Sequence, residues 1–227
     1  INTGVNARIG GIRVLGIWRD DRYFELLLGR MSDANPNARA AAISAVAKHQ
    51  RNDIVRELST HLQDSDSIVR IEAVAALGQV NSPRVQGALY QALYDEDPAV
   101  RTEAMSQVHR FSNDARAALK VTEFLNDEDE SFREATALTL LRFEDPRTFD
   151  AMTKRLAKEK STSVRLRLIS AIARSNPRKA MPYLIELLST SEGRDVGVIA
   201  QNLSQVSGQE LGLKPEPWKS WWAAQTK

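Results

Sequence analysis

Apolar residues in this chain recur at the spacing of an α-helix. Val85, Leu89 and Leu93 fall four residues apart, which places them on one helical face. The segment 100–108 repeats this spacing with valine and alanine. Strict alternation of apolar and polar residues, which is typical of half-buried strands, is absent. The pattern predicts an all-α protein built from short amphipathic helices.

A polar phrase that begins with an acidic residue and ends with arginine recurs between these helices. Its copies are DANPNAR (33–39), DSDSIVR (64–70), DEDPAVR (95–101), DEDESFR (127–133) and EKSTSVR (159–165). The arginines therefore return every 31 or 32 residues. Extending the period backward reaches Arg8, and extending it forward reaches Gly197, where the arginine is lost. A fixed period of this length indicates about seven structural repeats.

Each repeat contains two helical patterns joined by the polar phrase. Pro83, Pro146 and Pro177 stand where first helices begin, a place where the missing N–H costs nothing. The phrase itself is predicted to form a turn and to cap the second helix. One such pair cannot bury its apolar face alone, so neighbouring pairs must stack. The sequence predicts an α–α superhelix of about seven stacked pairs.

The two ends of the chain depart from the repeat. Residues 1–207 are predicted to form the array, and its first repeat is incomplete because residues 1–16 lack a preceding first helix. We expect either that an N-terminal segment is missing or that residues 1–16 pack against another chain.

Residues 208–227 are predicted to be a loop followed by a C-terminal capping helix. Gly208 is expected to end the last repeat, and Gly212, Pro215 and Pro217 to form the loop. Three tryptophans then fall at helical spacing i, i+3 and i+4. They are Trp218, Trp221 and Trp222. We expect this aromatic face to cover the open side of the last repeat. The alternative is an exposed anchor for a partner.

The phrase Asp-x-(Asp/Asn)-x-x-Val-Arg-x-x-Ala at this period resembles the HEAT-like repeats of phycobilin lyase subunits, over nearly the whole chain. The resemblance implies a right-handed α–α superhelix with its second helices on the concave side. It also implies a ladder in which acidic and arginine side chains bind each turn to the next. Its arginines are Arg8, Arg39, Arg70, Arg101, Arg133 and Arg165, and its acids are Asp33, Asp64, Asp95, Asp127 and Glu159. Asn2 and Ser191 take the acidic place in the terminal repeats, so the ladder is expected to fade at both ends. We interpret the ladder as structural and not catalytic, because guanidinium and carboxylate pair as a fork.

The tryptophan-rich tail resembles the endings of bacterial HEAT-repeat proteins, several of which are found in the cell envelope. Composition leaves the cellular compartment open, and the resemblance favours the periplasmic side of a bacterial envelope, with the cytoplasm as the alternative.

Charge and composition narrow the function classes. The 227 residues hold 31 Lys and Arg against 29 Asp and Glu, a net charge of +2 that does not favour nucleic acid. The chain has no cysteine, which excludes disulfides, iron–sulfur clusters and thiol nucleophiles. No apolar run approaches the roughly 18 residues that span a bilayer.

The residues of the chain give no catalytic or metal-binding motif. The three histidines, His49, His61 and His109, form neither a His-x-x-x-His nor a His-Glu pair. The chain therefore lacks the metal ligands that the metal-dependent hydroxylases among HEAT-like proteins need. The acidic cluster 127–130 precedes a helix, where capping is a better explanation than a calcium site. The sequence therefore predicts no enzymatic activity, metal or cofactor.

A basic column is the candidate binding surface. Nine positions beyond the ladder arginines stand Lys48, Gln79, Arg110, Arg142 and Arg174. We expect them to form a ridge at the ends of the second helices, beside a floor of small residues. Such a groove could hold an acidic or phosphorylated segment. The alternative is that cations at helix C-termini only complement the helix dipole.

The leading functional hypothesis is a non-catalytic protein–protein interaction scaffold. It would bind a partner protein or acidic peptide on the concave surface. One alternative is an enzyme subunit of the chromophore-lyase type, which rests on the fold resemblance alone. Another is a nucleic-acid-binding protein, which would need a basic, aromatic-lined cleft. The aromatic residues Tyr23, Phe24, Tyr90, Tyr94 and Phe124 fall instead in first-helix segments.

Overall fold

The computed structural model describes residues 3–111, 114 and 116–225. The chain divides into two compact units, unit 1 (Ile1–Val108) and unit 2 (His109–Lys227). All regular secondary structure of the described residues is helical.

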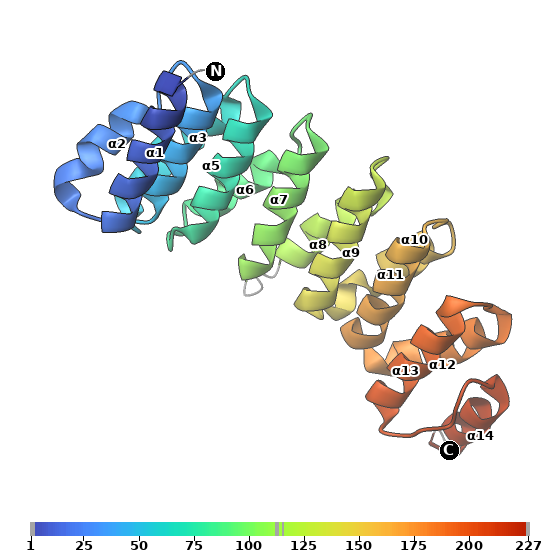
Figure 1. The fold of residues 1–227 in the computed structure, drawn as a ribbon. Coiled ribbons are helices and arrows are strands. Elements are labelled where there is room, and N and C mark those ends of the chain that lie inside the picture. The colour runs from blue at the N-terminus through green and yellow to red at the C-terminus, as the bar shows by residue number, and fades with distance from the viewer. Residues whose placement is uncertain (1–2, 112–113, 115, 226–227) are drawn as a thin grey trace. The chain divides into compact units, whose positions relative to one another are not determined.

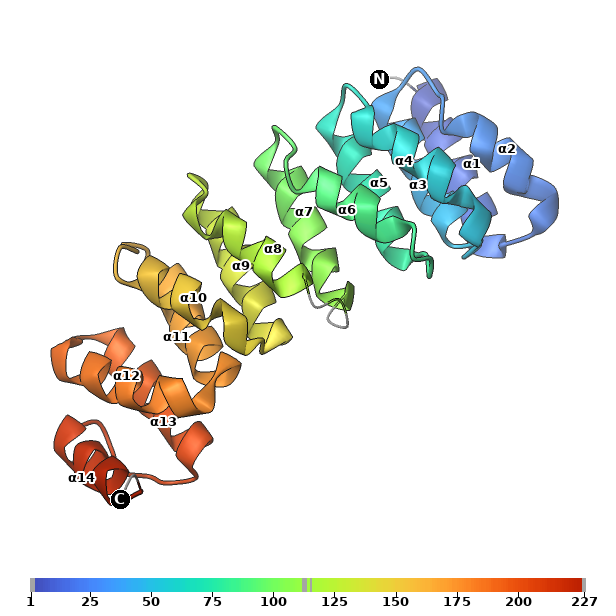
Figure 2. The ribbon, with the colours of Figure 1, turned by 180° about the vertical axis from the view of Figure 1, so that it is seen from behind.

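Unit 1 consists of two layers of helices. The longer helices lie side by side in the layer facing the viewer in Figure 1, and we call them second helices. They are α1 (Thr3–Trp18), α3 (Pro36–Ala47), α5 (Ser67–Gln79) and α7 (Pro98–Val108). The first helices face the viewer in Figure 2, and they are α2 (Phe24–Arg30), α4 (Val55–Thr60) and α6 (Val85–Ala92). Short 3₁₀ turns flank them at Asp21–Tyr23, Asn52–Ile54 and His61–Gln63.

Unit 2 repeats the two layers and adds a final helix. Its second helices are α9 (Glu130–Phe143), α11 (Thr162–Ser175) and α13 (Arg194–Ser207). Its first helices are α8 (Ala117–Thr122), α10 (Phe149–Leu156) and α12 (Pro177–Thr190), and the final helix is α14 (Pro215–Gln225). The 3₁₀ turns are His109–Phe111, Glu123–Asn126 and Pro146–Thr148. Repeated helix pairs in two layers are the arrangement of an α-solenoid, the predicted fold class.

The polar phrase caps the second helices. Asn35 accepts hydrogen bonds from the backbone N–H groups of Asn37 and Ala38 at the start of α3. Asp66, Asp129 and Ser161 cap α5, α9 and α11 in the same way.

The three prolines predicted to open first helices take different positions. Pro177 is the first residue of α12, but Pro146 opens a 3₁₀ turn and Pro83 lies in a turn before α6.

Three second helices are followed by a residue other than glycine in the left-handed region. Arg19, Gln50 and Glu144 have φ of 49°, 53° and 51°. Each stands eleven positions beyond its ladder arginine, although none is glycine. The left-handed residue turns the chain out of the helix, at a cost that packing must offset.

Small side chains let the second helices of unit 1 approach closely. Ala42, Ala45, Ala73 and Ala76 are buried between them. The backbones of α1 and α3 approach closely at Gly16 of α1, where an added Cβ would lie 2.6 Å from the Cβ of Ala45. A larger residue there would force the two helices apart.

The helix α14 packs on α12 of unit 2. Trp218 is fully buried, and its indole Nε1 donates a 2.8 Å hydrogen bond to the carbonyl of Gly212. Trp221 and Trp222 are half-buried beside it. The expected stop at Gly208 is present, with φ of 71°. The predicted loop is shorter than expected, because Pro215 and Pro217 lie in the first turn of α14, where a helix needs no N–H donor.

Candidate functional site

Arginine and acidic side chains link successive turns within each unit. Arg39 donates from Nε and Nη2 to the two carboxylate oxygens of Asp64, at 2.8 and 2.7 Å. Its Nη1 donates to the backbone carbonyl of Asp33 in its own turn. The pairs are Arg8–Asp33, Arg39–Asp64 and Arg70–Asp95 in unit 1, and Arg133–Glu159 and Arg165–Asp195 in unit 2. Each of these arginines therefore binds the acid of the following turn, and those from Arg39 onward also donate to a backbone carbonyl of their own turn.

The ladder acids also shape their own turns. Asp64 accepts a hydrogen bond from the backbone N–H of Asp66, and Asp33, Asp95 and Asp127 accept from the residue two positions on. Burial alone would raise the pKa of Asp64, but the Arg39 guanidinium and the Asp66 N–H outweigh it and lower that pKa. Arg101 donates to the backbone carbonyls of Asp95 and Glu96 within unit 1.

The expected fading of the ladder at its C-terminal end is wrong. Ser191 does replace the acid, but Asp195, in the first turn of α13, accepts hydrogen bonds from Arg165. Asp195 reaches the guanidinium because α13 begins at Arg194, immediately after the turn. At the other end, Asn2 lies outside the described residues, and Arg8 pairs with Asp33 while staying 40% exposed.

Glu159 is the most heavily engaged acid of unit 2. It is buried and accepts hydrogen bonds from both Arg133 and Arg155, and from the backbone N–H groups of Lys160 and Ser161. Burial by itself raises the pKa of Glu159, but these donors outweigh it and bring the pKa from its ordinary 4.5 to about 2. The negative charge of Glu159 is therefore bound by donors in and beside its own turn.

A hollow opens on the second-helix face of unit 1, and we call it the α3 trough. Its floor is α3, which presents the small residues Ala40, Ala41, Ser44 and Ala45, with Lys48 at the end of the helix. Arg13 and Ile17 of α1 form one wall, and Ile68 and Glu72 of α5 form the other. Ile17 is 68% exposed and Ile68 is 50% exposed. The trough therefore combines apolar and charged side chains around a shallow floor.

Charged side chains on the second-helix face of unit 2 are largely paired. Glu134 of α9 accepts from Arg167 of α11 at 3.3 Å, and Glu144 accepts from Arg174 at 2.7 Å. Asn202 of α13 donates to Ser170 of α11 at 3.3 Å. These contacts run between neighbouring helices and occupy polar groups that a partner would otherwise meet.

The residues of the predicted basic ridge fall in both units. In unit 1, Lys48 is the half-buried C-cap of α3, and Gln79 is the exposed last residue of α5. In unit 2, Arg110, Arg142 and Arg174 are all exposed. Arg142 lies 3.4 Å from His109 Nδ1, and Arg174 has the carboxylate of Glu144 as its counter-ion. The unit 2 part is therefore less positive than its sequence indicates.

Sequence comparison identifies the repeat. A family model described as HEAT repeats matches residues 24–107, 55–140 and 87–165, which together make up more than half of the chain. This chain is a HEAT-repeat protein. Among curated proteins, no relative of similar sequence was found.

Solved structures share the fold of this HEAT-repeat protein. The protein YibA of E. coli has a TM-score of 0.65 at 20% identity, covering 88% of this chain and 75% of its own. The complex of CpcE and CpcF of phycocyanin lyase from Nostoc gives 0.56 at 16% identity, covering 81% and 76%. A designed armadillo repeat protein gives 0.53 at 16% identity, covering 80% and 98%. At these identities the likeness concerns the fold alone.

The described residues of the HEAT-repeat protein contain no group of three or more His, Asp or Glu side chains placed to hold a metal ion. His49 is buried edge-on against Phe24, and His61 is half-buried, with a pKa that burial lowers. Within the described part of the chain, none of the helices has the length and apolar character needed to cross a membrane.

Sequence reasoning missed several of these residues. Asp195 and Arg155 lie outside the repeated phrase, so the period did not point to them. Ile17 and Ile68 follow the apolar helix pattern and were indistinguishable from core positions.

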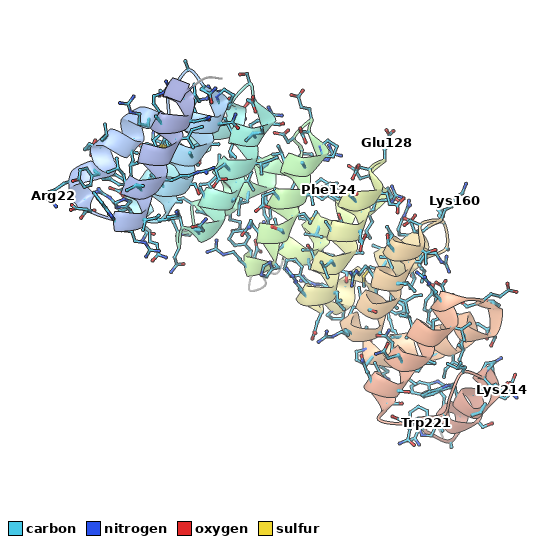
Figure 3. The ribbon with its side chains drawn as sticks, viewed as in Figure 1. Arg22, Phe124, Glu128, Lys160, Lys214 and Trp221 are labelled. Atoms are coloured by element: carbon cyan, nitrogen blue, oxygen red, sulfur yellow. The ribbon has the colours of Figure 1, made fainter. Side chains whose placement is uncertain are left out.

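In Figure 3, Glu128 and Lys160 mark turns of unit 2 and extend away from the helices, and both are exposed.

Proposed function

We propose that this HEAT-repeat protein is a non-catalytic scaffold that binds a protein partner on its second-helix face. The observation that supports the proposal is the α3 trough, where exposed aliphatic side chains flank a floor of small residues. Exposed apolar surface bordered by polar groups is typical of protein-binding sites. The ladder residues on the turns are engaged with each other and hold the repeats together.

The basic ridge predicted from the sequence is proposed as a further contact region in unit 2. Reversing charge in Arg110→Glu, Arg142→Glu and Arg174→Glu together is expected to abolish binding of a partner and to leave thermal stability nearly unchanged, because all three side chains are exposed. Normal binding by this triple variant would exclude the ridge from the interface.

Site-specific photo-cross-linking in cells tests the scaffold function. A cross-linking amino acid at Ser44 or Ser170 samples the second-helix face of each unit, and matched positions at Glu57 of α4 and Lys154 of α10 sample the first-helix layer. We expect a discrete protein adduct from the first pair only. Adducts confined to Glu57 and Lys154, or none from Ser44 and Ser170, would contradict the proposal.

The enzyme-subunit alternative has its own test. Mixing the purified protein with a linear tetrapyrrole should leave the absorption spectrum of the pigment unchanged if the protein is a scaffold. A stable spectral shift, or covalent transfer of the pigment to a second protein, would favour the lyase-type role.

A further inference from the structure

We propose that the α3 trough binds an amphipathic helix of a partner protein, one that presents aliphatic side chains and a carboxylate on the same face. This inference rests on the proposed scaffold function and specifies the chemistry of the partner. It concerns unit 1 alone.

The dimensions of the trough suit a helix. From Asn37 to Lys48 the floor follows α3 for about 16 Å, at 1.5 Å per residue. The walls α1 and α5 lie on either side of α3, so their axes are roughly 16–20 Å apart if neighbouring helices pack at 8–10 Å. A helix with its side chains is about 10–12 Å wide, and about three turns of it would lie along α3 between the walls.

Apolar side chains in the walls define one half of the partner's chemistry. Ile17 and Ile68 project from opposite walls and expose more than half and about half of their surface, respectively. The floor between them contributes Ala41 and Ser44, which leave room for side chains of the partner. Burying the two isoleucines against leucine-like anchors would remove their exposed apolar surface from water, which favours binding.

The charged groups define the other half. Arg13, Lys48 and Glu72 line the trough, and the structure gives none of their side chains a hydrogen bond or ion pair, not even with one another. The helix dipole accounts for Lys48, which caps the C-terminus of α3. It does not account for Arg13, which lies in the interior of α1, more than one turn before its end. Two unpaired cations against one unpaired anion favour a partner with a carboxylate facing Arg13 and Lys48.

The second-helix face of unit 2 provides the internal contrast. There Arg167 and Arg174 already have carboxylate partners on α9 or directly after it, at Glu134 and Glu144. An acidic helix would have to displace those carboxylates. The unpaired cations of unit 1 require no such exchange.

Peptide selection on the whole protein tests the proposal. A phage-displayed library of short random peptides is panned on the immobilised chain, and selected peptides are labelled for fluorescence anisotropy. We expect aliphatic residues at i, i+3 and i+4 spacing together with Asp or Glu, and affinity that falls with added salt.

Three paired variants locate the binding. Arg13→Glu with Lys48→Glu should weaken the selected peptides by about tenfold or more, and so should Ile17→Ser with Ile68→Ser. The charge-matched control is Arg56→Glu with Lys154→Glu, on exposed positions of α4 and α10 without ion pairs, and it should bind normally. Circular dichroism checks that each variant keeps its melting temperature.

The opposing results are distinct from failure of the scaffold function. Enrichment of basic peptides would overturn the trough proposal, and so would equal affinity of both trough variants and the control. In either case, cross-links from Ser44 or Ser170 would still support the scaffold function. Light scattering that shows a dimer abolished by Ile17→Ser with Ile68→Ser would assign the trough to a second copy of the chain and also overturn it.

Discussion

The second-helix faces of the two units have the same origin in the repeat but differ in how their charges are used. In unit 1, Arg13, Lys48 and Glu72 line one hollow without pairing. In unit 2, Glu134 and Glu144 bind Arg167 and Arg174 across neighbouring helices. The repeat sets where charged residues fall on each face, but it does not determine whether an oppositely charged residue stands beside them. A solenoid can therefore keep its backbone regular while one stretch satisfies its own charges and another leaves them for a partner.

The largest expected effect concerns the tryptophans of the terminal helices. Trp218 of α14 is fully buried in unit 2, whereas Trp18 of α1 is 61% exposed in unit 1. Trp218→Ala should lower the free energy of unfolding by about 3–5 kcal/mol, because it leaves a cavity and removes the bond to Gly212. Trp18→Ala should cost under about 1 kcal/mol, chiefly its contact with Tyr23. Urea unfolding followed by circular dichroism compares the two, and equal losses would contradict the buried cap.

The next effect separates the ladders of the two units. Glu159→Gln removes the charge that two arginines share in unit 2, and we expect a loss of about 3 kcal/mol. Asp64→Asn in unit 1 removes the partner of a single arginine and should cost less. The urea midpoints of the two variants measure the difference. A larger loss for Asp64→Asn would show that the second arginine adds no stability.

The same carboxyl predicts a pH dependence. The pKa of Glu159 is about 2 in the folded protein, below its ordinary 4.5, so the unfolded chain binds more protons between these values. The stabilisation from Glu159 is present above pH 4.5 and is lost as the pH falls toward 2. Melting temperatures of wild type and Glu159→Gln should therefore converge as the solution is acidified. A constant difference down to pH 2 would contradict the lowered pKa.

The periodic part of the molecule was predictable from sequence, and the exceptions were not. A period of 31 or 32 residues specified helix pairs, because only stacking buries their apolar faces. Asp195 was not predicted because it binds Arg165 from a different position in the repeat. The usual acidic position is occupied by Ser191. Arg19, Gln50 and Glu144 escaped because left-handed residues are expected to be glycine.

The candidate site was predictable only in outline. Counting along the repeat predicted that Ser44 and Lys48 lie on the second-helix face, and both line the α3 trough. The exposure of Ile17 and Ile68 did not, because an apolar residue at helical spacing normally belongs to the core. Pairing of Arg174 with Glu144 depends on which side chains neighbouring helices bring together, and this is a property of packing.

The smallest expected effect on stability gives the sharpest test of the comparison between faces. Glu134→Gln with Glu144→Gln removes both carboxylates from the second-helix face of unit 2 and leaves Arg167 and Arg174 without counter-ions. The pairs are partly exposed, so the free energy of unfolding should fall by less than about 1 kcal/mol in total. The selected acidic peptides should now bind unit 2 as well as the α3 trough, and binding should persist when Arg13→Glu and Lys48→Glu are added. Fluorescence anisotropy at low and high salt measures this gain. If the four-site variant binds no better than Arg13→Glu with Lys48→Glu alone, unpaired cations are insufficient, and the aliphatic walls of Ile17 and Ile68 distinguish the two faces.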